Sequence, residues 1–399
     1  MCARKFTFFG IAFILQQLLA AASFGEVLYE SRFQSCDRLI CMTVEIREMK
    51  VPFIFDTGAE LTLFDQTMPV GRLIQQGSIQ TATGQFTSDI RFYESPEIHF
   101  GLVQRTPIAV SVSDLSLFSN INGSDVKGFL GMDVLRHYVV EISPDDGMLR
   151  VHDKLPEIKL GKRAVLRWKR LAPYVKLTLS NGRDVEFLVD TGFSTGDSGS
   201  LESSLADTLI RTGHARLATN ARSVTVDTIG KLHKQESVDV PSVSLAGYVT
   251  PNTRWQRSGR NILGLGALCR FNVVFDFPQS AIYLSPSSRF DTPETFNRSG
   301  LHGLRRRPNE VVIDAVDPDS PAMKAGVRVG DILKRVKTEK TTETTQRRMY
   351  QMFGVPKGPV TVFVERDGQE TEFVLDWTDP PPMPPPPPSK KKMLDPDED

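Results

Sequence analysis

The sequence predicts a mainly β protein with two similar lobes, followed by a small α+β domain. Two observations predict the lobes. The triplet Asp-Thr-Gly occurs at residues 56–58 and again at 190–192, and a second shared block follows each copy at nearly equal spacing. A third observation predicts the small domain, because beyond about residue 286 strand-like runs alternate with short helical signals. A repeat of this kind indicates that the two lobes share one architecture.

Each triplet follows the sequence pattern of a β-hairpin. Residues 43–46 and 51–55 flank a short polar turn before the first triplet. Residues 174–179 and 185–189 flank Ser180-Asn181-Gly182-Arg183 before the second. Because Asn-Gly between two apolar runs is a strong hairpin signal, we expect a hairpin to deliver each triplet at the end of a strand.

The second shared block is an apolar-apolar-Gly sequence that continues into a short helical stretch and another strand. Residues 129–135 carry it in the first copy and residues 262–268 in the second. Its glycine lies 75 residues after Asp56 in the first copy (Gly131) and 74 after Asp190 in the second (Gly264). Near-equal spacing in both copies indicates duplicated lobes.

These blocks resemble the pepsin and retropepsin families, in which an apolar-apolar-Asp-Thr-Gly loop is followed by an apolar-apolar-Gly and a short helix. At about 130 residues each, the lobes are smaller than pepsin lobes and look like two retropepsin-type units in tandem. The resemblance covers about residues 40 to 286. It implies a bilobal aspartic-protease-like β-barrel pseudo-dimer, and two complete motifs in one chain make an intermolecular dimer unnecessary.

The resemblance implies that Asp56 and Asp190 are a joint catalytic pair. Two carboxylates a few ångströms apart share one proton and titrate as a pair. The ionised member takes a proton from a water, and the protonated member polarises the scissile carbonyl, so no cofactor is required. The sequence leaves open which aspartate holds the proton.

The other triplet residues are expected to support the catalytic loops. Gly58 and Gly192 let backbone amides approach the carboxylates. In the family the motif threonines hydrogen-bond to the opposite loop, which would make Thr57 and Thr191 a lock between the lobes. The alternative is that each triplet is only a strand followed by a turn.

The residue after each triplet departs from the family pattern. Pepsin-like enzymes usually carry Ser or Thr there, whereas this chain has Ala59 and Phe193. Ala59 cannot donate a side-chain hydrogen bond, and Phe193 crowds the loop unless Ser194 substitutes for it. Loss of that donor raises the pKa of the pair, so we expect a pH optimum less acidic than that of pepsin.

A flap over the substrate is expected from a hairpin in each lobe. Residues 81–85 are the candidate in the first lobe, with Thr83 and Gly84 at the tip, although the tyrosine usual in pepsin is absent. Residues 229–231 are the equivalent in the second lobe. An ordinary hairpin is the alternative for both.

The C-terminal part closely resembles bacterial-type PDZ domains. Its signature is a Ser-Pro-Ala…Ala-Gly-Val…Gly-Asp-Ile-Leu run, in which Ser320 is the expected N-cap, Pro321 the first helical residue and Gly326 the helix end. The remaining elements are a strand at 311–316, a groove helix at 344–353 and final strands at 360–365 and 372–377.

PDZ domains bind an extended C-terminal peptide as an added strand, with backbone amides around its carboxylate. The resemblance assigns this role to Gly300, Leu301, Gly303 and Leu304. Residues 305–307, all arginine, either attract an anionic terminus or form a solvated loop.

The N-terminus has the layout of a signal peptide. Arg4 and Lys5 precede apolar residues 6–15 and 18–22, with small residues near a cleavage point. Gln16 and Gln17 disfavour a membrane span, although an uncleaved anchor is the alternative. We therefore expect a secreted or periplasmic protein that contacts a membrane only if this segment is uncleaved.

Composition narrows the remaining possibilities. The chain has 48 basic and 48 acidic residues, which argues against a nucleic-acid partner. The histidines have no ligand spacing, so no metal site is expected. Cys36 and Cys41 either pair in an oxidising compartment or stay reduced, and Cys269 would then remain alone.

A serine protease is the alternative suggested by Gly196-Asp197-Ser198-Gly199-Ser200, which resembles the nucleophile segment of trypsin-like enzymes. That chemistry also needs a histidine base and an orienting carboxylate. No histidine motif precedes Ser198, and the segment begins only seven residues after Asp190. The aspartic interpretation is therefore favoured.

The sequence thus predicts an exported aspartic endopeptidase that acts on protein or peptide substrates, with a PDZ domain that recognises peptides. The alternative is an inactive peptide-binding or scaffold protein that keeps the protease fold. The expected parts are a signal peptide at 1–25, lobes at 26–152 and 153–286, a linker at 287–299, a PDZ domain at 300–378 and a disordered proline-rich, charged tail at 379–399.

Overall fold

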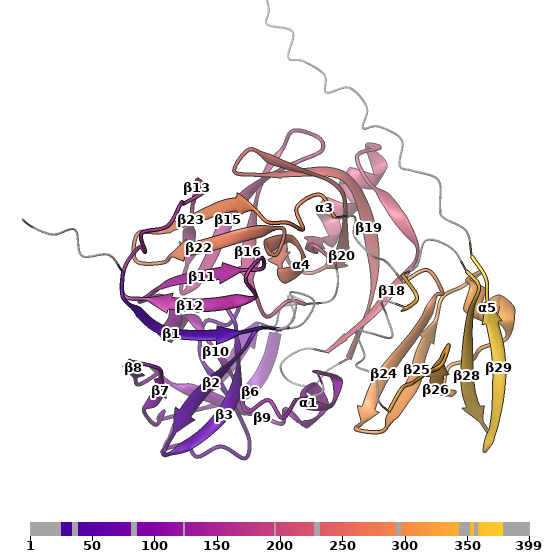
Figure 1. Cartoon of the computed structure of the whole chain (residues 1–399), viewed down its shortest axis with the longest axis horizontal. Helices are drawn as coiled ribbons and strands as arrows, with labels where there is room; N and C mark the ends of the chain where they lie inside the picture. The colour runs from indigo at the N-terminus through magenta and orange to yellow at the C-terminus, as the bar shows by residue number, and fades with distance from the viewer. Residues whose placement is uncertain are drawn as a thin grey trace, which may run out of the picture.

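The chain is mainly β, as the sequence predicts (Figure 1). The computed structural model describes residues 25–33, 39–80, 86–122, 124–194, 197–226, 232–292, 297–342, 352–354 and 358–377. The expected signal peptide, both flap tips and the tail beyond residue 377 lie outside these residues. In the part that is described, no helix has the length and apolar character needed to cross a membrane.

The first lobe is built on a nine-stranded sheet of order β5-β6-β9-β4-β10-β3-β2-β7-β8. The elements up to its end are β1 (Val27–Arg32), β2 (Cys41–Ile46), β3 (Met49–Phe55), β4 (Leu63–Asp65), β5 (Leu73–Gln80), β6 (Phe86–Tyr93), β7 (Ile98–Phe100), β8 (Val103–Arg105), β9 (Val110–Ser113), α1 (Ser116–Asn122), β10 (Gly128–Leu130), α2 (Met132–Leu135), β11 (Val139–Ser143) and β12 (Met148–His152).

The second lobe contains an eight-stranded sheet of order β14-β15-β16-β21-β17-β20-β19-β18. An additional pairing of β15 with β19 closes six of these strands into a barrel. The elements are β13 (Lys162–Val165), β14 (Arg167–Lys169), β15 (Ala172–Leu179), β16 (Asp184–Asp190), β17 (Gly199–Glu202), α3 (Ser203–Arg211), β18 (Arg216–Val226), β19 (Leu232–Leu245), β20 (Tyr248–Ser258), β21 (Ile262–Gly264), α4 (Leu265–Leu268), β22 (Phe271–Asp276) and β23 (Ala281–Pro286).

The two lobes repeat one strand plan. The expected hairpins are confirmed, with β2 antiparallel to β3 and β15 antiparallel to β16. The strand that carries the triplet then pairs in parallel with the strand of the second shared block, β3 with β10 and β16 with β21. The short helices α2 and α4 follow Gly131 and Gly264.

The lobes differ where one long strand of the second lobe corresponds to two in the first. Strand β19 runs unbroken through 14 residues, whereas β6 and β7 are separated by residues 94–97. Pro96 lies in that gap, and proline cannot donate to a strand ladder. The second lobe therefore closes into a barrel through one continuous strand, whereas in the first lobe the corresponding strand is interrupted between β6 and β7.

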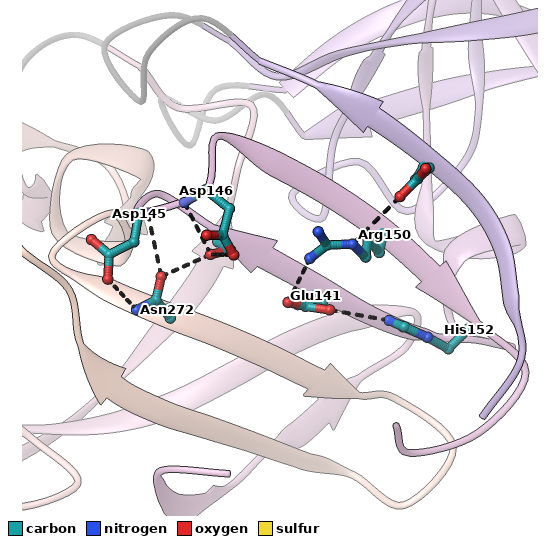
Figure 2. A network of polar contacts seen from close by, with 8 residues as sticks. Glu141, Asp145, Asp146, Arg150, His152 and Asn272 are labelled. Carbon is teal, nitrogen blue, oxygen red and sulfur yellow. Dashed lines mark hydrogen bonds and ion pairs between the residues drawn. The ribbon is translucent and has the colours of Figure 1, made fainter. Parts of the chain in front are cut away.

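A six-stranded sheet of order β1-β12-β11-β22-β23-β13 joins the lobes. Its central pair, β11 and β22, comes from different lobes and is antiparallel, with Val140 opposite Phe275. Side chains reinforce this junction, as Figure 2 shows: Asn272 donates to Asp145 at 2.7 Å and accepts from Ser143 at 3.1 Å. The join thus has both main-chain and side-chain hydrogen bonds.

A second polar group lies on the first-lobe side of this sheet (Figure 2). Arg150 of β12 donates to Glu141 of β11 at 2.9 Å, and the buried His152 lies 3.3 Å from the other oxygen of Glu141. The His152 hydrogen bond and the Arg150 guanidinium together lower the pKa of Glu141. Glu141 is therefore a stable anion that ties two neighbouring strands.

The C-terminal domain has its own sheet, of order β24-β25-β26-β28-β29 with β27 paired to β26. Its elements are β24 (Leu301–Arg307), β25 (Glu310–Val316), α5 (Pro321–Ala325), β26 (Ile332–Val336), β27 (Glu339–Lys340), β28 (Val360–Arg366) and β29 (Gln369–Leu375). The predicted strands and the capped helix are confirmed, whereas the expected groove helix at 344–353 falls mostly outside the described residues.

The two lobes share one main hydrophobic core, and the C-terminal domain has another. One continuous core runs from Tyr29 to Leu284 through both lobes, and a separate one runs from Leu301 to Trp377. The lobes thus share a core that the C-terminal domain does not enter.

The cysteine expectation is wrong in one respect. Cys269, buried after α4, is disulfide-bonded, whereas Cys41 is in no disulfide and lies with its Sγ 3.9 Å from the carbonyl oxygen of Leu39. A Cys36–Cys41 bridge is therefore excluded. Closeness in sequence favoured that pair, but the fold decides which sulfur atoms can meet.

Candidate functional site

Asp56 and Asp190 lie where the strand that carries each triplet ends. Asp56 follows β3, and its amide donates to the carbonyl of Leu130 at 3.1 Å. Asp190 is the last residue of β16 and is opposite Gly264 in the parallel register with β21. Both carboxyl groups are buried, with 5% of each residue exposed. The parallel pairing in each lobe therefore fixes its aspartate on a central strand.

The two triplets meet across the junction between the lobes. A β-carbon at Gly58 would lie 2.3 Å from Cγ of Asp190, and one at Gly192 would lie 2.6 Å from Cγ of Asp56. Neither distance is sterically possible, so only glycine permits this approach. The carboxyl groups of Asp56 and Asp190 hydrogen-bond each other as a result.

The threonines cross-link the two loops in a reciprocal pattern. Thr57 donates from its hydroxyl to the carbonyl of Val189 at 2.8 Å, and Thr191 donates to the carbonyl of Phe55 at 2.8 Å. Each hydroxyl also accepts from the backbone amide of the other threonine, at 3.0 and 3.1 Å. Four hydrogen bonds between fully buried groups thus hold the aspartates in register.

Burial dominates the electrostatics of the pair. Burial raises the pKa of Asp56 to about 6, against hydrogen bonds from the backbone amides of Gly58 and Ala59. Burial, together with the neighbouring Asp56 carboxylate, raises the pKa of Asp190 well above its usual range. The pair therefore carries one proton over a wide pH interval, and Asp190 retains it more strongly.

The residues after the triplets also differ in what their amides bind. The amide of Ala59 donates to Oδ1 of Asp56 at 3.2 Å, whereas the amide of Phe193 donates to the main-chain carbonyl of Asp190 at 3.3 Å. Asp56 therefore gains an amide that Asp190 lacks. The Phe193 ring, which was expected to crowd the loop, packs instead on an apolar patch beside it.

A buried carboxylate supports the first-lobe loop and was not anticipated from sequence. Asp133, in α2, accepts from the amide of Thr62 at 3.0 Å and from its hydroxyl at 2.8 Å. Burial raises the pKa of Asp133 to about 6. The only available signal was an aspartate within an apolar block.

Arg260 and Tyr174 beside Asp190 were also missed. The guanidinium of Arg260 donates to the hydroxyl of Tyr174 at 2.9 Å, and its positive charge opposes the upward shift in the pKa of Asp190. No motif marks these residues, since they lie 86 positions apart and meet only through the sheet.

Ser198 lacks the exposure of a nucleophile. It is 1% exposed, its amide donates to the carbonyl of Arg254 at 2.9 Å, and its carbonyl accepts from Gly264 at 2.9 Å. Ser198 therefore lies in a buried segment that leads into β17, which does not suit a nucleophile. In the part of the chain that the structure describes, Ser194 makes no hydrogen bond to either aspartate, so it does not substitute for the missing donor.

The candidate peptide-binding residues of the C-terminal domain lie on an edge strand. Gly300 turns the chain at φ +69°, and Leu301, Gly303 and Leu304 belong to β24. The resemblance implies a carboxylate-binding loop near residues 300–304, but only Gly300 lies in a turn, because pairing with β25 extends the other residues as a strand. Helix α1 lies against β24 (Figure 1), and Asn120 donates to the carbonyl of Arg306 at 3.3 Å.

Helix α5 has the predicted caps. The hydroxyl of Ser320 accepts from the amide of Met323 at 3.2 Å, Pro321 begins the helix, and Gly326 ends it at φ +94°. Near the helix, the buried His302 and Asp317 lie 3.0 Å apart. This part of the domain is thus fixed by local polar contacts.

Comparison with known protein families identifies one domain. Residues 312–366 match the family model of the PDZ domain, so the chain contains a PDZ domain near its C-terminus. No curated protein matches the chain. PDZ domains bind peptides or proteins, so a peptide or protein partner is supported for this part of the molecule.

Chemically, the site between the lobes offers one acid and one base in contact. Among the residues that the structure describes, no group of three or more His, Cys, Asp or Glu could hold a metal ion. The arrangement suits activation of a water and protonation of a carbonyl by carboxyl groups alone.

Proposed function

We propose that this protein is an exported aspartic endopeptidase whose substrates are proteins or peptides. One observation carries the proposal: two buried aspartates, each from an Asp-Thr-Gly triplet, are in hydrogen-bond contact, with the glycine of the opposite triplet beside each. Bringing two carboxyl groups together in a buried site is destabilising, so the arrangement is best explained by acid-base chemistry.

In this mechanism Asp56 is the base and Asp190 the acid. The lower pKa of Asp56, about 6, makes it the member that is ionised first and takes a proton from the attacking water. Asp190 keeps its proton and donates a hydrogen bond to the scissile carbonyl oxygen. Water attack gives a tetrahedral intermediate, which collapses when the leaving nitrogen receives the proton that Asp56 took up.

The threonine lock supports this chemistry by pre-organising the pair. Thr57 and Thr191 bind the opposite loop through buried hydrogen bonds, so neither carboxyl group can move away from the other without breaking them. A fixed separation keeps the proton shared and avoids reorganisation during the reaction.

Two observations support export to an oxidising compartment. The N-terminal residues have the charge and apolar pattern of a signal peptide. Cys269 is disulfide-bonded, and disulfides persist mainly in secreted or periplasmic proteins. The PDZ domain would recruit substrates by their C-termini, which PDZ domains bind as an added strand.

The test is peptidase activity of the full-length purified protein on a mixed peptide library between pH 4 and 8. We expect cleavage that is lost in both Asp56→Asn and Asp190→Asn and retained in Ser198→Ala. Asp145→Asn is the matched control, because Asp145 is an exposed carboxylate at the lobe junction. If the wild type cleaves nothing, or if both aspartate variants remain active, the endopeptidase proposal is wrong.

A further inference from the structure

The side chains next to Asp190 form a small composite surface on the second lobe. Leu188 lies two residues before Asp190 on β16, so both side chains are on one face of the strand. Leu188 is opposite Tyr174 on one neighbouring strand and opposite Ile262 on the other. Residues opposite each other in a sheet share a face, so Tyr174 and Ile262 flank Leu188 on the side of Asp190.

The floor of this surface is apolar and its rim is polar. Ala172, Leu188 and Ile262 form a buried patch against which Tyr174 and Phe193 pack. The partly buried Arg260 donates from Nη2 to the hydroxyl of Tyr174, one of the residues that cover the patch, at 2.9 Å. A cation held by a hydroxyl therefore lies next to a buried apolar patch that is covered by the partly buried Tyr174 and Phe193.

Hydrogen bonds to the main chain of residues 260 and 261 fix the backbone that carries the Arg260 side chain. Its carbonyl accepts from the hydroxyl of Ser200 at 2.8 Å, and the next residue, Asn261, accepts at its carbonyl from the amide of Leu188 at 3.0 Å. The side-chain oxygen of Asn261 also accepts from the backbone amide of Glu202 at 2.7 Å. The guanidinium is thus presented from a fixed segment, which reduces the ordering needed to bind an anion.

In contrast to its neighbours, Arg260 makes no ion pair with a carboxylate among the described residues, although its charge reaches Asp190. Arg170 lies 3.2 Å from Glu60, and Arg167 lies 3.1 Å from Glu186. A partly buried arginine with one neutral partner retains donors for a further acceptor, and a bidentate carboxylate matches them.

The corresponding position in the first lobe has no basic side chain without an ion pair among the described residues. In the second lobe Leu188 is opposite Tyr174 on one side and Ile262 on the other. In the first lobe the corresponding residue is Ile54, which is opposite Cys41 and Phe129. Lys127, two residues before Phe129, corresponds to Arg260. It lies 2.9 Å from Asp125 and 4.0 Å from Asp65, so its charge is already neutralised.

We propose that Arg260 and Tyr174 form a substrate subsite that selects an acidic side chain beside the scissile bond. The partly buried rings of Tyr174 and Phe193, which cover the apolar patch, contact the methylene groups of a glutamate, and Arg260 with the Tyr174 hydroxyl binds its carboxylate. This inference rests on the proposed function, since it names the substrate class of that same site. Because the first lobe has no equivalent, the selection applies to one side of the scissile bond only.

The test compares paired peptides that differ only by Glu or Gln at each position that flanks the cleaved bond, assayed with the full-length protein at pH 6.5. At that pH a peptide glutamate, with a pKa of about 4.3, is ionised. We expect kcat/KM to favour Glu by about tenfold at one flanking position, as a charge-assisted hydrogen bond predicts. Arg260→Gln should abolish this preference, and Tyr174→Phe should reduce it.

Arg167→Gln is the control, because it removes the same charge from an exposed position of the same lobe and should leave the ratio unchanged. Arg260→Lys should retain part of the preference. Equal cleavage of Glu and Gln peptides by the wild type, or a ratio that Arg260→Gln does not alter, would overturn the subsite while leaving the endopeptidase proposal intact.

A binding assay distinguishes failure of the subsite proposal from failure of the endopeptidase proposal. Fluorescence anisotropy on the Asp56→Asn variant measures the affinity of the same labelled peptide pairs without cleavage. An Arg260-dependent preference for Glu in binding supports the subsite even if the wild type cleaves no peptide. Absence of that preference in both binding and cleavage overturns it.

Discussion

Replacing Asp56 with asparagine should make the protein more stable near neutral pH while abolishing its proposed activity. The substitution keeps the side-chain oxygen that accepts from Gly58 and Ala59 at 2.8 and 3.2 Å. It replaces a buried carboxylate by a neutral amide that can donate to Asp190. The variant thus keeps the two amide contacts of Oδ1 and loses a buried charge.

The magnitude follows from the pKa of Asp56. A carboxyl group whose pKa is higher in the folded protein contributes most to stability when protonated in both states, below about pH 3.8. That contribution is lost as pH rises from 3.8 to about 6, and the loss is constant above. A shift of this size corresponds to about 3 kcal/mol at 1.36 kcal/mol per unit. The variant also removes the negative charge next to Asp190, which further increases the stability of the folded protein.

The assay is differential scanning calorimetry of the full-length protein at pH 7.5 and pH 4. At about 2–4 °C per kcal/mol for a unit of this size, we expect the melting temperature of the lobes to rise by about 6–12 °C at pH 7.5. At pH 4 the difference should nearly vanish, because Asp56 is then protonated in the folded protein. The PDZ transition, which has a separate core, serves as an internal reference.

The reasoning is refuted if Asp56→Asn lowers the melting temperature at pH 7.5, or if it raises it equally at both pH values. Asp145→Asn is the opposite control. Hydrogen bonds from Asn272 and Ser288 lower the pKa of Asp145, so its replacement should not stabilise the protein at pH 7.5. A stabilisation common to both variants would reflect loss of net charge rather than relief of a buried carboxylate.

Three further predictions follow from the same contacts. Peptidase activity should rise through about pH 6 as Asp56 ionises, and fall at higher pH when Asp190 loses its proton; a pH profile of kcat/KM with a maximum below pH 5 contradicts these pKa shifts. Thr57→Val should destabilise the lobes by about 2–4 kcal/mol in urea unfolding, because it leaves the carbonyl of Val189 and the amide of Thr191 buried without partners. Thr178→Val, at an exposed hydroxyl bonded to Asp184, should change little. Gly300→Ala should destabilise the PDZ domain more than Gly368→Ala, as followed by Trp377 fluorescence. Both glycines have positive φ, but a β-carbon at Gly300 would lie 2.2 Å from Cβ of Ser320, whereas Gly368 faces open space; equal effects would mean that backbone strain alone decides.

Much of the architecture was predictable because it depends on local sequence signals. The hairpin before each triplet, the short helices after Gly131 and Gly264, and the caps of α5 are all set by residues within a few positions of one another. A duplicated motif also predicts how its two copies are arranged in space. Two copies of one loop must meet near a pseudo-twofold axis if the lobes pack alike, so the contact between Asp56 and Asp190 could be expected.

Features that join distant segments could not be predicted in this way. The barrel closes only in the second lobe because β19 is continuous, whereas Pro96 lies in a break in the first lobe. The disulfide at Cys269 replaced the pairing that sequence proximity favoured. Residues 301–304 became an edge strand because β25 was available to pair with them.

The sequence by itself determined the class of fold, the two aspartates and the PDZ signature, because each is encoded in contiguous residues. The tertiary structure alone decided which aspartate holds its proton more strongly and that Arg260 reaches Tyr174 beside one of them. Both depend on burial and on strand register, and these arise only when segments far apart in the chain pack together.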